Sequence, residues 1–304
     1  MAFAQSEHGL SERTACKLLG VERSSYRYET RPDRNAELRE EMVKLARQKP
    51  RYGYRRLHAL LQRSGANQGQ PLNVKRIYRL YREEGLSVRR KKRKRLVRER
   101  AAEPRLTGPN QEWAMDFVTD GLATGRMVRI LTVVDAYTRE CVALEADFSL
   151  GSGRVTRVLE RAIAERGRPQ QVRSDNGPEF TSRRMIGWAE EWKVGLVNIE
   201  PGKPMQNGHV ESFNGRLRDE CLDTSWFRTL NDVRETLANW RREYNCERPH
   251  SSLDYRTPEE FRQQIGCADV ESKVRFPRPH SLDDGDENKI SKQNQNWETP
   301  VMNG

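Results

Sequence analysis

Three acidic residues stand where an apolar or neutral side chain would be the easier choice. Asp116 interrupts a predicted strand, Asp175 ends a short one, and Glu211 borders the apolar stripe of a predicted helix. A buried carboxylate is costly unless it is paired or bound to a metal ion. If the three side chains converge, they predict a metal site.

Phosphodiester cleavage is the chemistry that such a carboxylate set supports. It needs an activated water or hydroxyl on one side of the phosphorus and a stabilised leaving oxygen on the other. Two Mg²⁺ or Mn²⁺ ions about 4 Å apart supply both, and these ions prefer hard oxygen ligands. We assign the bridging position between the ions to Asp116, with Asp175 and Glu211 each holding one ion.

Other polar residues in the same region have simpler explanations. Asp135 ends a predicted strand and is expected to cap a turn, although a direct metal role is the alternative. His209 and His250 could contact substrate or act as bases, but packing against the fold is commoner, and neither is assigned a catalytic role. The remaining acids are interpreted as solvated or capping residues: Asp120, Glu179, Asp219 and Glu220.

The elements that must position the carboxylates alternate between strands and helices. Strand patterns are predicted at 113–118, 129–134, 141–147, 171–174 and 194–199. Helices are predicted from about residue 152 onward, at 181–192, at 206–222 and at 230–244. In the third helix, Val210, Phe213, Leu217 and Cys221 form an apolar stripe, with Glu211, Asn214 and Arg218 together beside it. The order predicts an α/β domain in which helices flank a mixed sheet.

The charge of the chain is concentrated in its first third. Residues 1–105 contain 28 Lys and Arg against 12 Asp and Glu, whereas 106–304 contain 27 against 32. A basic segment of this size indicates a nucleic-acid partner. No apolar run approaches the length of a membrane span, so we expect a cytoplasmic protein with no membrane partner. The five scattered cysteines are expected to be reduced structural thiols.

The basic first third is predicted to be helical. Segments 11–19 and 23–28 have the outline of a helix-turn-helix, and helices are expected at 35–48, 54–64 and 73–85. Val74, Ile77, Tyr78 and Tyr81 recur at helical spacing, which leaves Lys75, Arg76 and Arg79 on exposed sides. DNA binding is preferred over the alternative of a solvated bundle. The basic run 89–95 is interpreted as a linker along phosphates, although a nuclear localisation signal would look similar.

Several motifs resemble the transposases of the insertion-sequence-three group, which are relatives of retroviral integrases. The matching segments are RYGYRR at 51–56, WAMDF at 113–117, SDNGPEF at 174–180, NGHVESFN at 207–214, NCERPH at 245–250 and TPEEF at 257–261. The resemblance covers most of residues 11–262. Thirty-five residues separate Asp175 from Glu211, as in that group.

The resemblance implies a ribonuclease H-like integrase core, with the catalytic and metal-binding triad on Asp116, Asp175 and Glu211. It also implies that the enzyme nicks the ends of a mobile element and uses the freed 3′ hydroxyl for strand transfer into target DNA. The expected organisation is a helix-turn-helix-like segment at 1–32, a helical DNA-binding domain at 33–88, a basic linker at 89–107, the core at 108–265 and a mostly disordered tail at 266–304. The expected localisation is the bacterial cytoplasm.

Basic and polar residues of these segments are the predicted DNA contacts. They are Arg51, Tyr52, Arg55, Arg56, Lys75, Arg76, Arg79, Arg90, Lys91, Lys92, Arg93, Lys94, Arg95, Lys203, Asn214 and Arg218. The expected partners are the terminal inverted repeats of the element, target DNA and further copies of the chain. Members of the resembled group are often made as a frameshift fusion whose upstream part carries another DNA-binding domain and a leucine zipper. No sustained heptad run is present here, so the resemblance implies a helix-turn-helix protein from an upstream reading frame as a further partner.

The sequence departs from retroviral integrases in one segment, and two rival functions compete with the transposase interpretation. Retroviral integrases carry a zinc-binding His and Cys domain that has no counterpart here, so the helix-turn-helix segments must replace it. A catalytically idle DNA-binding regulator is one rival, but three intact carboxylates argue against it. A related nuclease that cuts without joining is the other, and only the family motifs favour joining.

Overall fold

The computed structural model describes residues 6–7, 9–29, 33, 35–65, 69–88, 106–200 and 207–265. The chain divides into two units, Met1–Gln263 and Gln264–Gly304, and the named elements below all lie in the first. The predicted basic run 89–95, Lys203 and the predicted disordered tail lie outside the described residues. Within them, no helix is long and apolar enough to cross a membrane.

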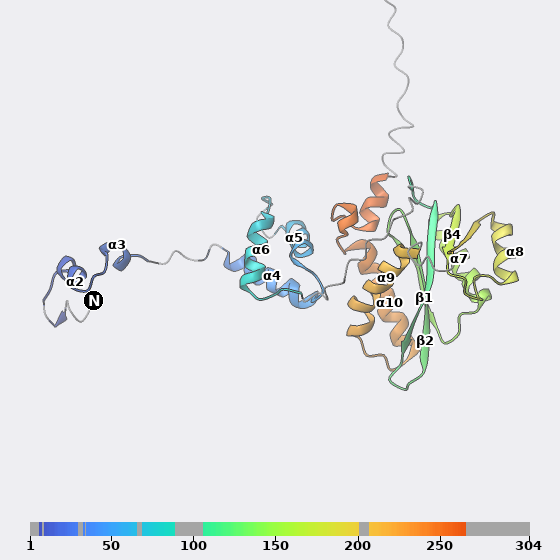
Figure 1. Cartoon of the computed structure of the whole chain (residues 1–304), viewed down its shortest axis with the longest axis horizontal. Helices are drawn as coiled ribbons and strands as arrows, with labels where there is room; N and C mark the ends of the chain where they lie inside the picture. Colours follow the sequence, from blue (N-terminus) through green and yellow to red (C-terminus); the bar gives the residue numbers. More distant parts are fainter. Residues whose placement is uncertain are drawn as a thin grey trace, which may run out of the picture. The chain divides into compact units, whose positions relative to one another are not determined.

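Five strands form a mixed sheet (Figure 1). They are β1 (Glu112–Gly121), β2 (Met127–Asp135), β3 (Cys141–Asp147), β4 (Gln171–Ser174) and β5 (Gly195–Asn198). The spatial order is β3-β2-β1-β4-β5, with β1 antiparallel to β2 and parallel to β4. This arrangement confirms the α/β fold class that the sequence predicts, and it places β1 at the centre of the sheet.

Helices cover both faces of this sheet (Figure 1). One apolar cluster joins the sheet to α7 (Ser152–Arg166) and α8 (Arg183–Trp192). The other joins it to α9 (Gly208–Glu220) and α10 (Leu230–Cys246). Successive strand residues point to opposite faces, so Met115 belongs to the first cluster and Val118 to the second. Asp116 therefore faces the side that carries α9.

The apolar stripe predicted on α9 is confirmed. Val210, Phe213 and Leu217 are at most 1% exposed, and Cys221 follows directly after the helix in the same cluster. Two short 3₁₀ helices are described in this part of the chain: η2 (Leu222–Thr224) lies between α9 and α10, and η3 (Ser251–Leu253) follows α10. Residues 258–265 are again helical.

Among the described residues, five named helices precede the sheet. They are α2 (Glu12–Leu18), α3 (Arg23–Tyr26), α4 (Ala36–Gln48), α5 (Tyr54–Arg63) and α6 (Val74–Glu83). The last three share a small apolar core. In α6 the buried residues are Ile77, Leu80 and Tyr81, whereas Val74 and Tyr78 are each 43% exposed. The predicted spacing was therefore correct, but the buried stripe is shifted around the helix.

Candidate active site

Strand β1 presents Asp116 toward α9. The side-chain amide of Asn214 on α9 donates to Oδ2 of Asp116 over 2.8 Å, and the backbone N–H of Phe117 donates to Oδ1 over 2.8 Å. Burial raises the pKa of Asp116, and the nearby carboxylates of Asp175 and Glu211 raise it further, while the two donated hydrogen bonds oppose these effects. The charges of Asp175 and Glu211 therefore both act on Asp116.

Asp175 follows directly after the last residue of β4. Ala114 of β1 pairs with Arg173 of β4 in parallel register, so Asp116 and Asp175 lie two residues further along, at the same level of adjacent strands. The backbone N–H of Gly177 donates to Oδ1 of Asp175 over 3.0 Å. A Cβ at Gly177 would lie 3.0 Å from the same oxygen, which explains why glycine occupies this turn.

Glu211 lies in the first turn of α9 and is exposed. The helix packs against β1 and β2 through its apolar stripe, which brings its first turn toward the strand that carries Asp116. Within the described ranges, no three His, Cys, Asp or Glu side chains already stand in a metal-holding arrangement. The donor set nevertheless fits Mg²⁺ or Mn²⁺, because mutually repelling carboxylates supply hard oxygens and gain from a bound cation.

Comparisons with known proteins show the family of the chain. Models of the integrase core domain match residues 107–204 and 193–258, and a model of an HTH-like domain matches 32–94. A 31.7 kDa protein of insertion element IS407 from Burkholderia multivorans is 48% identical over 265 residues, covering 86% of this chain and 94% of the relative. The chain belongs to the insertion-element transposase family.

Two further proteins and one solved structure are similar to the transposase. A 39.2 kDa protein of insertion element IS476 from Xanthomonas euvesicatoria is 44% identical, covering 88% of this chain and 77% of the relative. Transposase InsD for insertion element IS2D from Escherichia coli is 29% identical, covering 72% and 75%. The HTLV-2 integrase catalytic core domain aligns with a TM-score of 0.44 and 16% identity, covering 52% of this chain and 99% of that domain.

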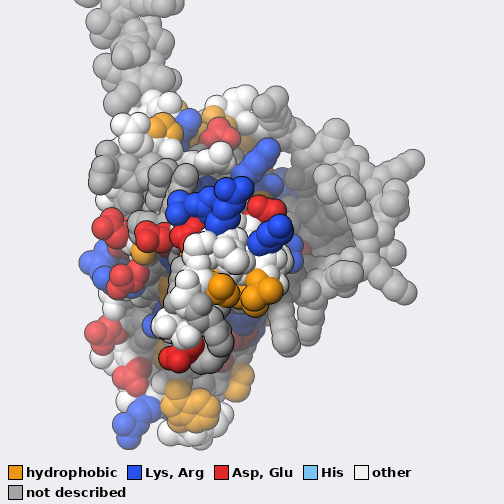
Figure 2. Space-filling view, turned by 90° about the vertical axis from the view of Figure 1, so that its left-hand side faces the viewer, with side chains coloured by type: hydrophobic (Ala, Val, Ile, Leu, Met, Phe, Trp, Pro, Cys, Tyr) orange, Lys and Arg blue, Asp and Glu red, His pale blue; other side chains and the backbone are white. Residues whose placement is uncertain are grey.

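The predicted DNA contacts on α6 of the transposase lie on its surface. Lys75 and Arg79 are exposed, and Arg79 forms a weak ion pair with Glu83 at 3.6 Å. Arg76 is half-buried and donates to the side chain of Asn35 over 2.7 Å. Figure 2 shows one face of the molecule on which Lys and Arg side chains gather in a patch. Lys75 and Arg79 are therefore accessible to a phosphate backbone.

The predicted contacts in the RYGYRR motif have partners within the transposase. Tyr52 is 4% exposed, and its hydroxyl donates to Glu243 over 3.3 Å. Arg56 pairs with Glu220 at 3.1 Å, and Arg51 lies 3.8 Å from Asp219. Arg55 is exposed and contacts the ring of Tyr54. Sequence reasoning missed these internal partners, because it could not show which surface faces the motif.

Asn214 and Arg218, the predicted contacts on α9, differ in their surroundings. Asn214 is 8% exposed and bonded to Asp116, while its Oδ1 is buried and has no hydrogen-bond partner among the described residues. Arg218 is exposed and donates to the carbonyl oxygen of Thr119 over 3.0 Å. The shared helical face was predicted correctly, but the sequence did not indicate that Asn214 bonds to the carboxylate of Asp116.

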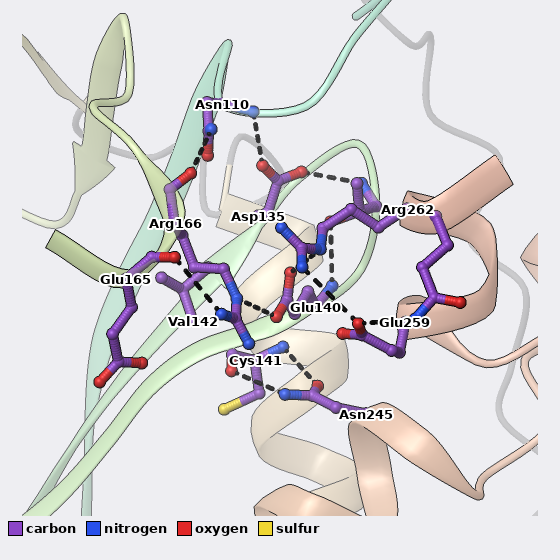
Figure 3. Close-up of polar contacts among 12 residues, drawn as sticks. Asn110, Asp135, Glu140, Cys141, Val142, Glu165, Arg166, Asn245, Glu259 and Arg262 are labelled. Atoms are coloured by element: carbon purple, nitrogen blue, oxygen red, sulfur yellow. Dashed lines mark hydrogen bonds and ion pairs between the residues drawn. The ribbon is translucent and has the colours of Figure 1, made fainter. Parts of the chain in front are cut away.

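The capping role predicted for Asp135 is confirmed. Its Oδ1 accepts the backbone N–H groups of Tyr137 and Thr138, and its Oδ2 accepts that of Asn110 (Figure 3). These bonds occupy both carboxylate oxygens with the turn between β2 and β3. Asp135 is thereby separated in function from the three acids of the candidate active site.

A buried ion-pair network beside this turn was not predicted. Glu140 is 2% exposed and accepts from Arg166 of α7 over 2.6 Å, while Arg262 of the last helical segment lies 3.6 Å away (Figure 3). The side chain of Asn245 on α10 bonds to both backbone groups of Cys141. Through these contacts, α7, α10 and the helical segment of Arg262 pack against the turn that follows β2. They thereby stabilise one end of the sheet that carries Asp116.

Proposed function

We propose that this transposase cleaves DNA at the ends of its element and joins the freed 3′ hydroxyl to target DNA, with Asp116, Asp175 and Glu211 as the catalytic residues. The observation that carries the proposal is geometric: Asp116 and Asp175 lie at the same level of adjacent strands, and Asn214, on the helix that carries Glu211, donates to Asp116 over 2.8 Å. Carboxylates gathered in this way repel one another, and a bound divalent cation would relieve that repulsion. The membership in the insertion-element transposase family supports the same reaction.

Each residue would have a separate role in the proposed reaction. Two Mg²⁺ or Mn²⁺ ions would activate the attacking oxygen and stabilise the leaving one. Asp116, central in the sheet, would bridge the ions, with Asp175 and Glu211 holding one each. Asn214 fixes the carboxylate of Asp116 through the 2.8 Å hydrogen bond. Lys75 and Arg79 on α6 would hold the DNA backbone, and two DNA ends would require at least a dimer, together with a possible upstream-frame partner.

The test is an assay on labelled element-end DNA with Mg²⁺ or Mn²⁺. Asp116→Asn and Glu211→Gln should bind DNA yet neither nick nor join it. Asp120→Asn is a matched control on the same strand, because Asp120 bonds only to the N–H of Gly121 among the described residues, and it should retain both activities. If the wild type binds and never cuts, even with an upstream partner added, the protein is an idle regulator. If it cuts without joining, it is a nuclease.

A further inference from the structure

A cavity separate from the candidate active site lies beside α9. Its volume is about 220 Å³, and its wall includes His209, Ser212 and Arg216, which recur at helical spacing. Glu211 and Asn214 belong to a different face of the same helix. The cavity wall contains four arginines and two histidines, and no Asp or Glu of the described chain lines it. This composition distinguishes it from the carboxylate site.

Two of the four arginines share one neutralising partner. Arg248 is 1% exposed in its side chain and donates two hydrogen bonds to Glu220, over 2.7 and 2.6 Å. Arg56 pairs with the same carboxylate at 3.1 Å. One negative charge thus offsets two guanidinium groups, and among the described residues Glu220 forms no ion pair with the other two arginines of the wall.

Arg139 and Arg216 have no such partner. In the described part of the chain, neither guanidinium lies within ion-pair distance of a carboxylate, although both are half-buried. Arg216 donates to the carbonyl oxygen of Ser212 on its own helix over 3.2 Å. Burial lowers the pKa of Arg139 and the like charge of Arg216 lowers it further, while Tyr244 and Asp135 oppose these effects. Two guanidinium groups without an ion-pair partner among the described residues therefore line the same cavity.

The fold holds Arg139 at this position. Its φ of 64° is in the left-handed region, which is unfavourable for a residue with a side chain. The turn capped by Asp135 enforces this conformation, because the backbone N–H of Arg139 also donates to the carbonyl oxygen of Asp135 over 2.9 Å. The backbone at the end of β2 thus fixes the position from which the Arg139 side chain extends.

His209 adds a donor to the same wall. The guanidinium of Arg139 contacts Nδ1 of His209. A guanidinium can only donate, so Nδ1 must accept and the ring proton must lie on Nε2. The wall consequently offers guanidinium and imidazole N–H groups, with the hydroxyls of Ser212 and Ser252 beside them. Such a set matches the oxygens of a doubly or singly charged oxyanion.

We propose that this cavity binds a phosphate group, held by Arg139 and Arg216. The phosphate could belong to the DNA that the transposase handles or be free in solution. Only the assignment to DNA rests on the proposed function. Phosphate binding itself needs neither catalysis nor a metal ion, so it can be tested in a protein that does not cut.

The first experiment follows thermal unfolding of the full chain in inorganic phosphate and in chloride at equal ionic strength. Phosphate should raise the Tm of the wild type in a concentration-dependent manner, and the rise should disappear in the double variant Arg139→Gln, Arg216→Gln. Arg157→Gln is a matched control, because Arg157 on α7 donates to the carbonyl four residues earlier, as Arg216 does. An equal rise in all three proteins overturns the proposal.

The source of the phosphate is decided by DNA binding. If the cavity takes a DNA phosphate, Arg216→Gln should reduce the slope of log affinity against log salt by about 0.9, as expected for one lost phosphate contact. If the slope is unchanged while the phosphate-dependent Tm rise is lost, the ligand is free phosphate. Because no cleavage is measured, failure here with an active wild type refutes the cavity alone, and the Asp116→Asn result bears only on the catalytic proposal.

Folding defects can be separated from ligand loss. Removing one of two repelling, unpaired guanidinium groups should leave the Tm in chloride unchanged or slightly higher. Arg216→Lys keeps the charge without the planar fork and should retain part of the phosphate effect. If Arg216→Gln lowers the Tm in chloride by several degrees and still responds fully to phosphate, Arg216 is structural and the proposal fails.

Discussion

Asn214 donates a hydrogen bond to Oδ2 of Asp116 over 2.8 Å, which connects the helix of Glu211 to the strand of Asp116. Both residues are removed from bulk water to some degree, with Asn214 8% exposed. The bond fixes the rotation of the Asp116 carboxylate while leaving further oxygen lone pairs available to a ligand. The bond thereby fixes the helix that carries Glu211 relative to the strand that carries Asp116, although these two residues are far apart in the sequence.

Replacing Asn214 should therefore impair the reaction more than DNA binding. Asn214→Ala removes the donor that orients Asp116, and loss of such a supporting contact typically lowers activity about 10- to 100-fold. Single-turnover nicking and filter binding of the same element-end DNA would separate the two effects. A weaker affinity with an unchanged nicking rate at saturating DNA would instead show that Asn214 is a DNA contact.

The buried pair Arg248–Glu220 should be sensitive to removal of one partner. Arg248→Met leaves the carboxylate of Glu220 without its bidentate partner and should lower the free energy of unfolding by about 3–5 kcal/mol. Adding Glu220→Leu should recover much of this loss. Urea unfolding at constant m-value provides the measurement. As a control, Arg154→Met breaks a more exposed pair with Glu145 and should cost less than about 1 kcal/mol.

His250 should make the stability of the fold depend on pH. Burial lowers its pKa from 6.5 to about 2, and the charge of Arg248 contributes. The folded protein thus holds His250 neutral, so its stability is fully present above pH 6.5 and falls as the pH drops from 6.5 toward 2. Between pH 7 and pH 5 the loss is about 2 kcal/mol. Urea titrations of wild type and His250→Gln should show that the variant lacks this difference, and parallel pH curves would contradict the assignment.

The cysteines should differ in their reactivity toward an alkylating reagent. Burial raises the pKa of Cys141 and of Cys221 to about 12, so both remain protonated thiols at neutral pH. Cys246 is exposed, and burial raises its pKa to a smaller extent. Mass spectrometry after iodoacetamide treatment at pH 8 should find Cys246 modified and the other two protected until the protein unfolds. Early modification of Cys141 would show that the end of β3 opens in the native state.

The sequence was most informative where a pattern is local. The predicted strand 141–147 agrees with β3, and the predicted helix 206–222 contains α9 with its buried stripe. These predictions succeed because hydrophobic periodicity records which face of an element is buried. The same local reasoning predicted that Asp135 caps a turn, since the residue stands where a strand ends.

Partners across the fold could not be predicted in the same way. A helical wheel places Asn214 beside Glu211 but contains no information on the strand opposite, so its bond to Asp116 was missed. Tyr52 was expected to contact DNA, and its burial against Glu243 depends on tertiary packing that no local pattern records. Glu140 was likewise overlooked, because its partners Arg166 and Arg262 come from distant segments.

β1 is the first strand in the sequence, so it is synthesised before the other strands of the sheet. During synthesis the helical segments and β1 are completed well before α9, and domains generally fold from the N-terminal end as they emerge. Asp116 therefore leaves the ribosome long before Glu211 can join it. A chain that stopped short of α9 would keep the surface of α6 and lack the third carboxylate. Under the proposed function, such a product would bind element ends without cutting them.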